Sequence, residues 1–133
     1  MWLVRTHIIP PAPYTALTLG PWLLIRRGVR LTPSLLRHER IHFRQCCELL
    51  FLFFYAAYLL EWLFRLVQEA FRDCCHKGKP HHKACPSLAT RAYLNISFER
   101  EAYAHQSDPH YLQQRRPYAF LRHLTAHRHA PRA

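Results

Sequence analysis

One short stretch of the chain places histidine and glutamate at the spacing of a zinc site: His38-Glu-Arg-Ile-His42, an HExxH motif. Residues four apart lie on one face of a helix, so the imidazoles of His38 and His42 can bind a single ion. Glu39 points about 100° away from His38 around the helix. Its carboxylate therefore lies beside the ion, where it can take a proton from a zinc-bound water. Because the chain has 11 histidines, the motif alone leaves open that both are surface residues.

A catalytic zinc ion of this kind needs a third protein ligand. The metzincin pattern, with glycine three residues after the second histidine and a third histidine three further on, is excluded because Gln45 and Glu48 stand there. The other carboxylates before residue 74 share one predicted helix with the motif. The residues that can fold back from another element are Glu99, Glu101 and Asp108.

The sequence around two of these residues is "SFEREAYAH", residues 97–105. Glu99-Arg-Glu-Ala-Tyr103 resembles the ExxAD signature of gluzincin-like, membrane-associated peptidases, with Tyr103 in place of the aspartate. The resemblance implies that Glu99 is the third ligand, with Glu101 as the alternative. It also implies that Tyr103 occupies the position of a residue that orients a zinc-bound histidine.

The resemblance extends to residues 31–66 and 92–124, which are similar to a family of small, largely uncharacterised bacterial proteins with HERIHxRQ, an apolar helix and ISFEREAY. It implies a mainly α fold with a small N-terminal β element (α+β), in which a long HExxH helix packs against a second, Glu-bearing helix in a minimal zincin-like domain. The implied function is that of a zinc metallopeptidase that binds one Zn²⁺, with Glu39 as general base and a peptide or protein as substrate. A catalytically inactive, membrane-associated metal-binding protein is the alternative.

Peptide hydrolysis also needs a donor for the developing oxyanion. The candidates, none favoured by spacing, are Tyr103, His105, His110 and Tyr111. By analogy to gluzincins, the segment from Trp22 to Arg27 is expected to pair with an extended substrate.

Local sequence signals predict the elements that position these residues. Residues 2–9, 14–19 and 22–29 are rich in β-branched and aromatic side chains and are separated by proline and glycine, which predicts two or three short strands. Thr32-Pro33 is a strong helix start, and no helix breaker follows before about Asp73. This length is unusual for a small globular protein and favours a bend somewhere along the helix. A second helix is expected over residues 87–106, followed by two short helices that begin near Pro109 and Pro117.

Residues 49–60 form an uninterrupted apolar stretch, "LLFLFFYAAYLL". This is about 18 Å of helix and is shorter than the roughly 20 residues that a bilayer core requires. The stretch is consistent with a core helix that is apolar on all sides, or with a helix in or on a membrane that is flanked by arginines.

The formal net charge is +11, which favours anionic partners. A nucleic-acid-binding protein is therefore a competing interpretation, although no recognised binding motif accompanies the charge. We expect one domain over residues 1–125 and a disordered basic tail over residues 126–133. The N-terminus has no pattern of a cleavable signal peptide, so a cytoplasmic or membrane-associated location is expected; the sequence does not indicate an oligomeric state.

Five cysteines occur as two adjacent pairs and one single residue, and adjacent cysteines are poor disulfide partners. A second metal loop remains open as an alternative, although it lacks a clean C-x₂-C pair. Its candidate ligands are Cys74, Cys75, His76, His81, His82 and Cys85.

Overall fold

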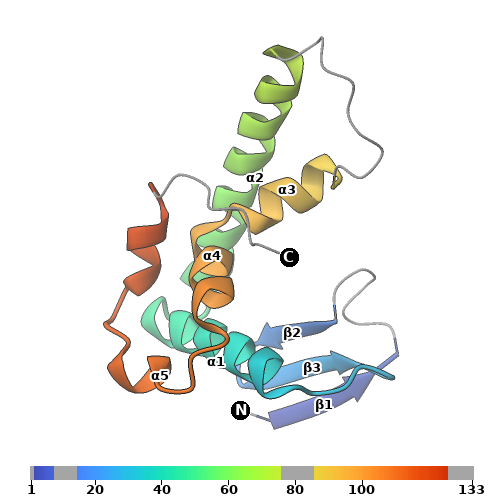
Figure 1. Ribbon diagram of the computed structural model, residues 1–133, viewed down its shortest axis with the longest axis vertical. Coiled ribbons are helices and arrows are strands. Elements are labelled where there is room, and N and C mark those ends of the chain that lie inside the picture. The colour runs from blue at the N-terminus through green and yellow to red at the C-terminus, as the bar shows by residue number, and fades with distance from the viewer. Residues whose placement is uncertain (1, 8–14, 76–85, 126–133) are drawn as a thin grey trace.

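The computed structural model describes residues 2–7, 15–75 and 86–125. The expected fold class is confirmed, since most of the described chain is helical and a small sheet lies at the N-terminus (Figure 1). The elements in chain order are β1 (Trp2–Thr6), β2 (Ala16–Leu19), β3 (Trp22–Arg26), α1 (Pro33–Glu48), α2 (Leu52–Cys75), α3 (Leu88–Leu94), α4 (Ser97–His105), α5 (Tyr111–Gln114) and the 3₁₀ helix η1 (Ala119–His123). The tail over residues 126–133 lies outside the described residues.

The sheet has the strand order β1-β3-β2. β3 pairs with β1 in parallel, with Trp2 opposite Trp22, and with β2 in antiparallel. A tight turn at Gly20, whose φ of 58° suits glycine, joins β2 to β3. The expectation that residues 22–27 pair with a substrate is wrong, because both edges of β3 are already hydrogen-bonded. β2 is instead a strand at the edge of the sheet.

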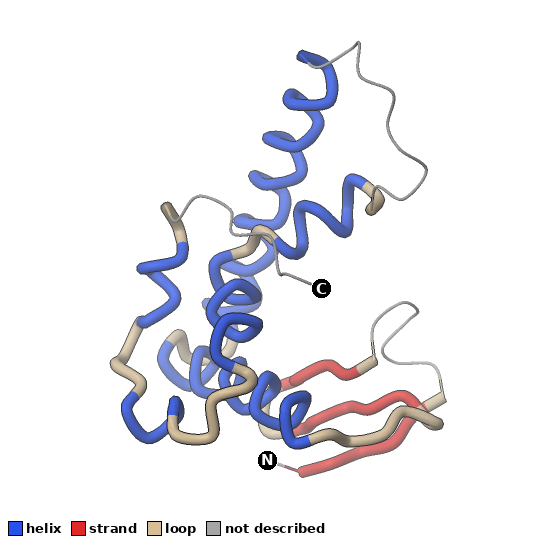
Figure 2. The backbone as a smooth tube through the Cα atoms, viewed as in Figure 1, coloured by secondary structure: helices blue, strands red, loops and turns tan. Residues whose placement is uncertain are grey.

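The long helix expected from Thr32 to Asp73 is two helices, α1 and α2, bent by 112° at a short break. Leu50 and Phe51 lie in the break with φ angles of 51° and 54°, a left-handed conformation that is unfavourable for such side chains. Packing accompanies this turn, since the Phe51 ring lies 6.4 Å from that of Phe43. The turn brings α2 alongside α3 (Figure 2), and side chains of α2 reach α4, as in the ring contact between Phe54 and Phe98.

The second expected helix is also divided, into α3 and α4, at Asn95 and Ile96. Glu61 of α2 binds the start of α4, because its carboxylate accepts hydrogen bonds from the Ser97 backbone N–H (2.9 Å) and hydroxyl (2.6 Å). This contact satisfies donors at a helix N-terminus. The start of α4, which carries Glu99 in its first turn, is thereby held against α2.

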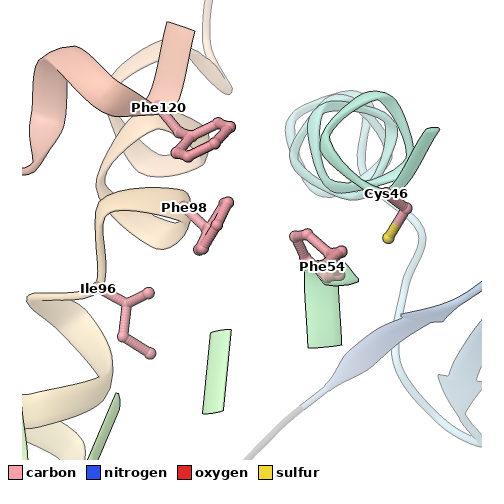
Figure 3. Close-up of a cluster of buried hydrophobic side chains, with 5 residues drawn as sticks. All are labelled: Cys46, Phe54, Ile96, Phe98 and Phe120. Atoms are coloured by element: carbon pink, nitrogen blue, oxygen red, sulfur yellow. The ribbon is translucent and has the colours of Figure 1, made fainter. Parts of the chain in front are cut away.

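Buried apolar side chains from α1, α2, α4 and η1 form one cluster (Figure 3). Phe98 is at its centre, with ring centroids 5.1 Å from Phe54 and 4.4 Å from Phe120. The remaining members are Cys46 and Ile96. Because Phe98 immediately precedes Glu99, the aromatic packing fixes the backbone that carries this carboxylate.

Replacing Arg115 by methionine should destabilise the fold strongly. The Arg115 side chain is buried and pairs with Glu48 of α1 and with Glu101 of α4, which is fully buried. Removal of the cation leaves two carboxylates without their partner, which costs about 3–5 kcal/mol. Urea unfolding measures this loss, and Arg116→Met at the neighbouring exposed position is the matched control. Equal stability of the two variants would show that the Arg115 pairs contribute little.

Candidate metal centre

Three buried side chains meet where α1 packs against α4: His38 and His42 from α1 and Glu99 from α4. His38 Nε2 and His42 Nε2 are 3.0 Å apart. Glu99 Oε1 lies 3.1 Å from His42 Nε2, and Glu99 Oε2 lies 3.3 Å from His38 Nε2. The structure therefore brings together the two histidines of the HExxH motif and one of the two glutamates considered as the third ligand. This cluster could hold a metal ion.

The spacing of these atoms fits a small tetrahedral ion. Bonds of about 2.0–2.1 Å to nitrogen and oxygen place neighbouring tetrahedral ligands about 3.3–3.4 Å apart, close to the observed 3.0–3.3 Å. Buried Glu99 Oε2 lies 3.3 Å from His38 Nε2 and makes no hydrogen bond within the described residues, so it has acceptor capacity left for an ion. Each histidine nitrogen faces a different oxygen of Glu99, and the three side chains surround one point at a spacing that is compatible with a small ion.

The charges of His42 and Glu99 depend on each other. Burial lowers the pKa of His42, but the Glu99 carboxylate outweighs this effect and raises it to about 9. Burial raises the pKa of Glu99, but the two histidines hold it well below its ordinary range. In the absence of an ion, a proton on His42 therefore neutralises Glu99.

Metal binding at pH 7 should release about one proton per ion. A histidine must be neutral to bind a metal, whereas a pKa of about 9 keeps His42 protonated at pH 7. Apparent affinity should consequently rise about tenfold per pH unit up to about pH 9 and level off above it. Titration calorimetry in two buffers of different ionisation enthalpy measures the released proton. A binding enthalpy that is the same in both buffers would contradict the assignment.

Gln45 orients His42. Its side-chain Nε2 donates to the Phe98 carbonyl (3.2 Å) and to Glu101 Oε2 (3.1 Å), so its Oε1 faces His42 Nδ1 at 2.8 Å. A carbonyl oxygen only accepts, so Nδ1 carries the hydrogen and Nε2 is left for an ion. The sequence predicted this type of role for Tyr103, and Gln45 was missed. Its position three residues after His42, on the same helix face, was the available signal.

Replacing Gln45 by leucine should weaken metal affinity about 10- to 100-fold, the usual effect of removing such an outer partner. The substitution preserves size but removes the acceptor that fixes the His42 tautomer. Competition with a chromogenic chelator measures the affinity. Arg44→Leu, at the exposed neighbouring position, should bind metal as the natural chain does. Unchanged affinity in the Gln45 variant would assign the orientation of His42 to packing alone.

Glu101, the alternative ligand, lies in a different set of contacts. It is fully buried and accepts hydrogen bonds from Arg115, Tyr111 and Gln45. Glu101 therefore contacts Gln45, and Gln45 in turn contacts His42. Its charge supports the site indirectly, through the orientation of Gln45.

Tyr58 of α2 is a further residue that sequence reasoning missed. Its hydroxyl donates to Glu99 Oε1 at 2.7 Å. The Glu99 carboxylate also affects Tyr93 of α3, whose pKa is raised first by burial and then by this negative charge. Tyr58 reaches Glu99 only because the chain turns back after α1, which the sequence did not show.

Glu39 is buried at the edge of a cavity of about 330 Å³. Its Oε2 accepts a hydrogen bond of 2.7 Å from the Thr18 hydroxyl on β2. The cavity is also lined by His38, by Tyr103 and by Ala16 of β2. The carboxylate of the motif, one histidine of the candidate metal cluster and the edge of the sheet therefore line one cavity.

Of the four predicted oxyanion donors, Tyr103 lines the cavity and the other three do not. The ring centroid of Tyr103 lies 4.7 Å from that of His38. His105 stacks on Tyr111 at 3.7 Å, and Tyr111 donates to Glu101. His110 is exposed next to α5.

The proposed cysteine loop falls mostly outside the described part of the chain, which includes neither His76, His81, His82 nor Cys85. Cys74 and Cys75 are exposed free thiols at the end of α2. Cys46 is a buried thiol in the aromatic cluster, where burial raises its pKa to about 12. Its protonated form suits a packing role.

Comparisons of the chain with protein-family models, with curated proteins and with solved structures found no match.

Proposed function

We propose that this protein is a zinc-dependent hydrolase of the gluzincin type that cleaves peptide bonds. The observation that carries the proposal is the triangle of His38, His42 and Glu99 donor atoms, with Glu39 and a cavity beside it. Two imidazoles and one carboxylate, with one position open, are a donor set typical of catalytic zinc. Imidazole favours zinc over magnesium or calcium, which prefer oxygen ligands alone.

Zinc bound here would supply a Lewis acid that makes water nucleophilic at neutral pH. Glu39 would act as the general base and then pass the proton to the leaving amine. The hydrogen bond from Thr18 to Glu39 Oε2 restrains this carboxylate, since an unrestrained side chain would lose the orientation that proton transfer needs. Tyr103, at the cavity wall, is the predicted donor best placed to stabilise the oxyanion.

The edge strand β2 supports a peptide as the substrate. Thr15 and Ala16 line the cavity next to His38 and Glu39, and β3 pairs with one side of β2. A substrate in extended conformation could add to the sheet along β2 by main-chain hydrogen bonds. A peptide bound along β2 would pass the metal. The sequence predicts the same role for residues 22–27, which contain a different strand, β3.

The test is digestion of a peptide library by the zinc-loaded chain, read by mass spectrometry. We expect cleavage that is lost with a chelator and restored by Zn²⁺. A folded chain that binds one zinc ion and cleaves no member of the library would favour the inactive metal-binding alternative.

A further inference from the structure

Helix α2 has its apolar side on the outside of the molecule. Six of its exposed side chains form what we call the apolar stripe: Leu52, Leu60, Leu63, Phe64, Val67 and Phe71. They are between 44% and 74% exposed. Apart from the adjacent pair Leu63 and Phe64, successive members are three, four or eight residues apart, which places them on one side of the helix. A helix that faces water normally shows the opposite polarity.

The charged residues of α2 lie on the other side and are used within the fold. Glu61 binds the start of α4. Glu69 accepts a hydrogen bond of 3.0 Å from Asn95, and Asp73 pairs with Arg91 of α3. The inward side of α2 is therefore a completed polar interface, and turning the helix to bury the stripe would break it.

The dimensions of the stripe suit a lipid surface. It runs from Leu52 to Phe71, about 28 Å at 1.5 Å per residue, and α2 extends well beyond the body formed by α1 and the sheet (Figure 1). The stripe covers roughly 120° of the helix, which is wider than the narrow seam of a helix pair. No single described helix is long and apolar enough to cross a membrane, although the bent pair of α1 and α2 together has the length and composition of a broken span. The charged inward side of α2 favours an orientation in the plane of the bilayer.

Cationic side chains lie near the N-terminal end of the stripe. Phe51, at the break before α2, contacts Phe43. Phe43 lines a cavity of about 710 Å³ together with Leu23, Arg40 and Arg44, and both arginines are exposed. Apolar walls with two guanidinium groups complement a phospholipid that carries a negative headgroup, as does the net charge of +11.

We propose that the apolar stripe of α2 docks on the surface of a bilayer rich in anionic phospholipid, with Arg40 and Arg44 near the headgroups. The stripe is on the exposed side of α2, whereas the metal centre lies between α1 and α4, so docking does not depend on zinc. The occupant is lipid and not a second copy of the chain, because the stripe is broad and no polar residue within it would set the register of a helix pair.

The test is synthesis of the full chain in a cell-free system with preformed vesicles, followed by flotation. Vesicles of phosphatidylcholine alone are compared with vesicles containing about one third phosphatidylglycerol. The variant Leu60→Glu/Phe64→Glu changes two exposed side chains of the stripe. Gln68→Glu adds one negative charge, half of what the double variant adds, at an exposed position of α2 outside the stripe and preserves the acceptor for Arg65.

We expect the natural chain and Gln68→Glu to float with the anionic vesicles, and the double variant to lose at least about tenfold in the bound fraction. Circular dichroism in mild detergent should show equal helix content for all three chains. Equal flotation of the double variant would overturn the proposal. A second outcome would also overturn it: the natural chain floats with neither vesicle type and forms a dimer, whereas the double variant is a monomer. The stripe would then be an interface between two copies of the chain.

Discussion

Replacing Glu99 by glutamine should reduce bound zinc from about one ion per chain to below about 0.1 after dialysis against a weak chelator. Glu99 supplies the single anionic ligand and lies within 3.3 Å of both histidine nitrogens. The amide keeps the size of the side chain but loses the charge that balances the ion. Metal analysis by mass spectrometry of the purified chain gives the ratio.

Glu101→Gln is the matched control for this prediction. Glu101 is on the same helix, is equally buried and is the other glutamate of the ExxA pattern, yet its contacts are with Arg115, Tyr111 and Gln45. We expect this variant to retain about one zinc ion while its thermal unfolding temperature falls. Zinc that is kept by Glu99→Gln and lost by Glu101→Gln would reverse the assignment of the third ligand.

Replacing Glu39 by glutamine should leave zinc bound and reduce peptide cleavage about 10²- to 10⁴-fold, the range for loss of a general base. The amide can still accept the hydrogen bond from Thr18 but cannot take a proton from water. Cleavage of the best peptide from the library measures the rate, and metal analysis of the same sample confirms loading.

Thr18→Val separates the position of the base from its chemistry. This variant keeps the Glu39 carboxylate and loses the hydroxyl that restrains it, so we expect a smaller reduction in rate, with the pH profile preserved. A Glu39→Gln variant that cleaves as fast as the natural chain would remove Glu39 from the mechanism and require another base.

The cluster of His38, His42 and Glu99 could be predicted because it rests on local spacing. Two histidines four apart share a helix face whatever the rest of the fold does, and the small number of carboxylates left few choices for a third ligand. The choice between Glu99 and Glu101 depends on the resemblance to ExxAD. Sequence spacing alone does not show which of two glutamates two residues apart faces the histidines.

The residues around this cluster could not be predicted in the same way, because they depend on where the chain turns. No glycine or proline occurs between Pro33 and Gly78, so nothing in the sequence marks the break at Leu50 and Phe51. That break brings Tyr58 to Glu99 and Glu61 to the start of α4. Tertiary packing here overrides the local preference for a continuous helix.

Two further features illustrate the same limit. The order of the strands decides which strands lie at the edges of the sheet, and strand order is not encoded in β-propensity. The sequence therefore predicts an accessible β3, whereas β3 is the central strand and β2 lies at an edge. For residues 49–60, composition left open whether the apolar stretch is core or faces lipid. The structure shows that Phe54 is buried while Leu52 and Leu60 are exposed, a division within one helix that average hydropathy cannot show.

X-ray absorption at the zinc edge of the zinc-loaded 133-residue chain tests the assignment of the metal centre most directly. Ligation by His38, His42 and Glu99 predicts nitrogen and oxygen neighbours at about 2.0–2.1 Å, the imidazole scattering of two histidines and no sulfur. Sulfur neighbours at about 2.3 Å would contradict this account. They would move the metal to the cysteines and leave the His38, His42 and Glu99 cluster as a buried ion pair.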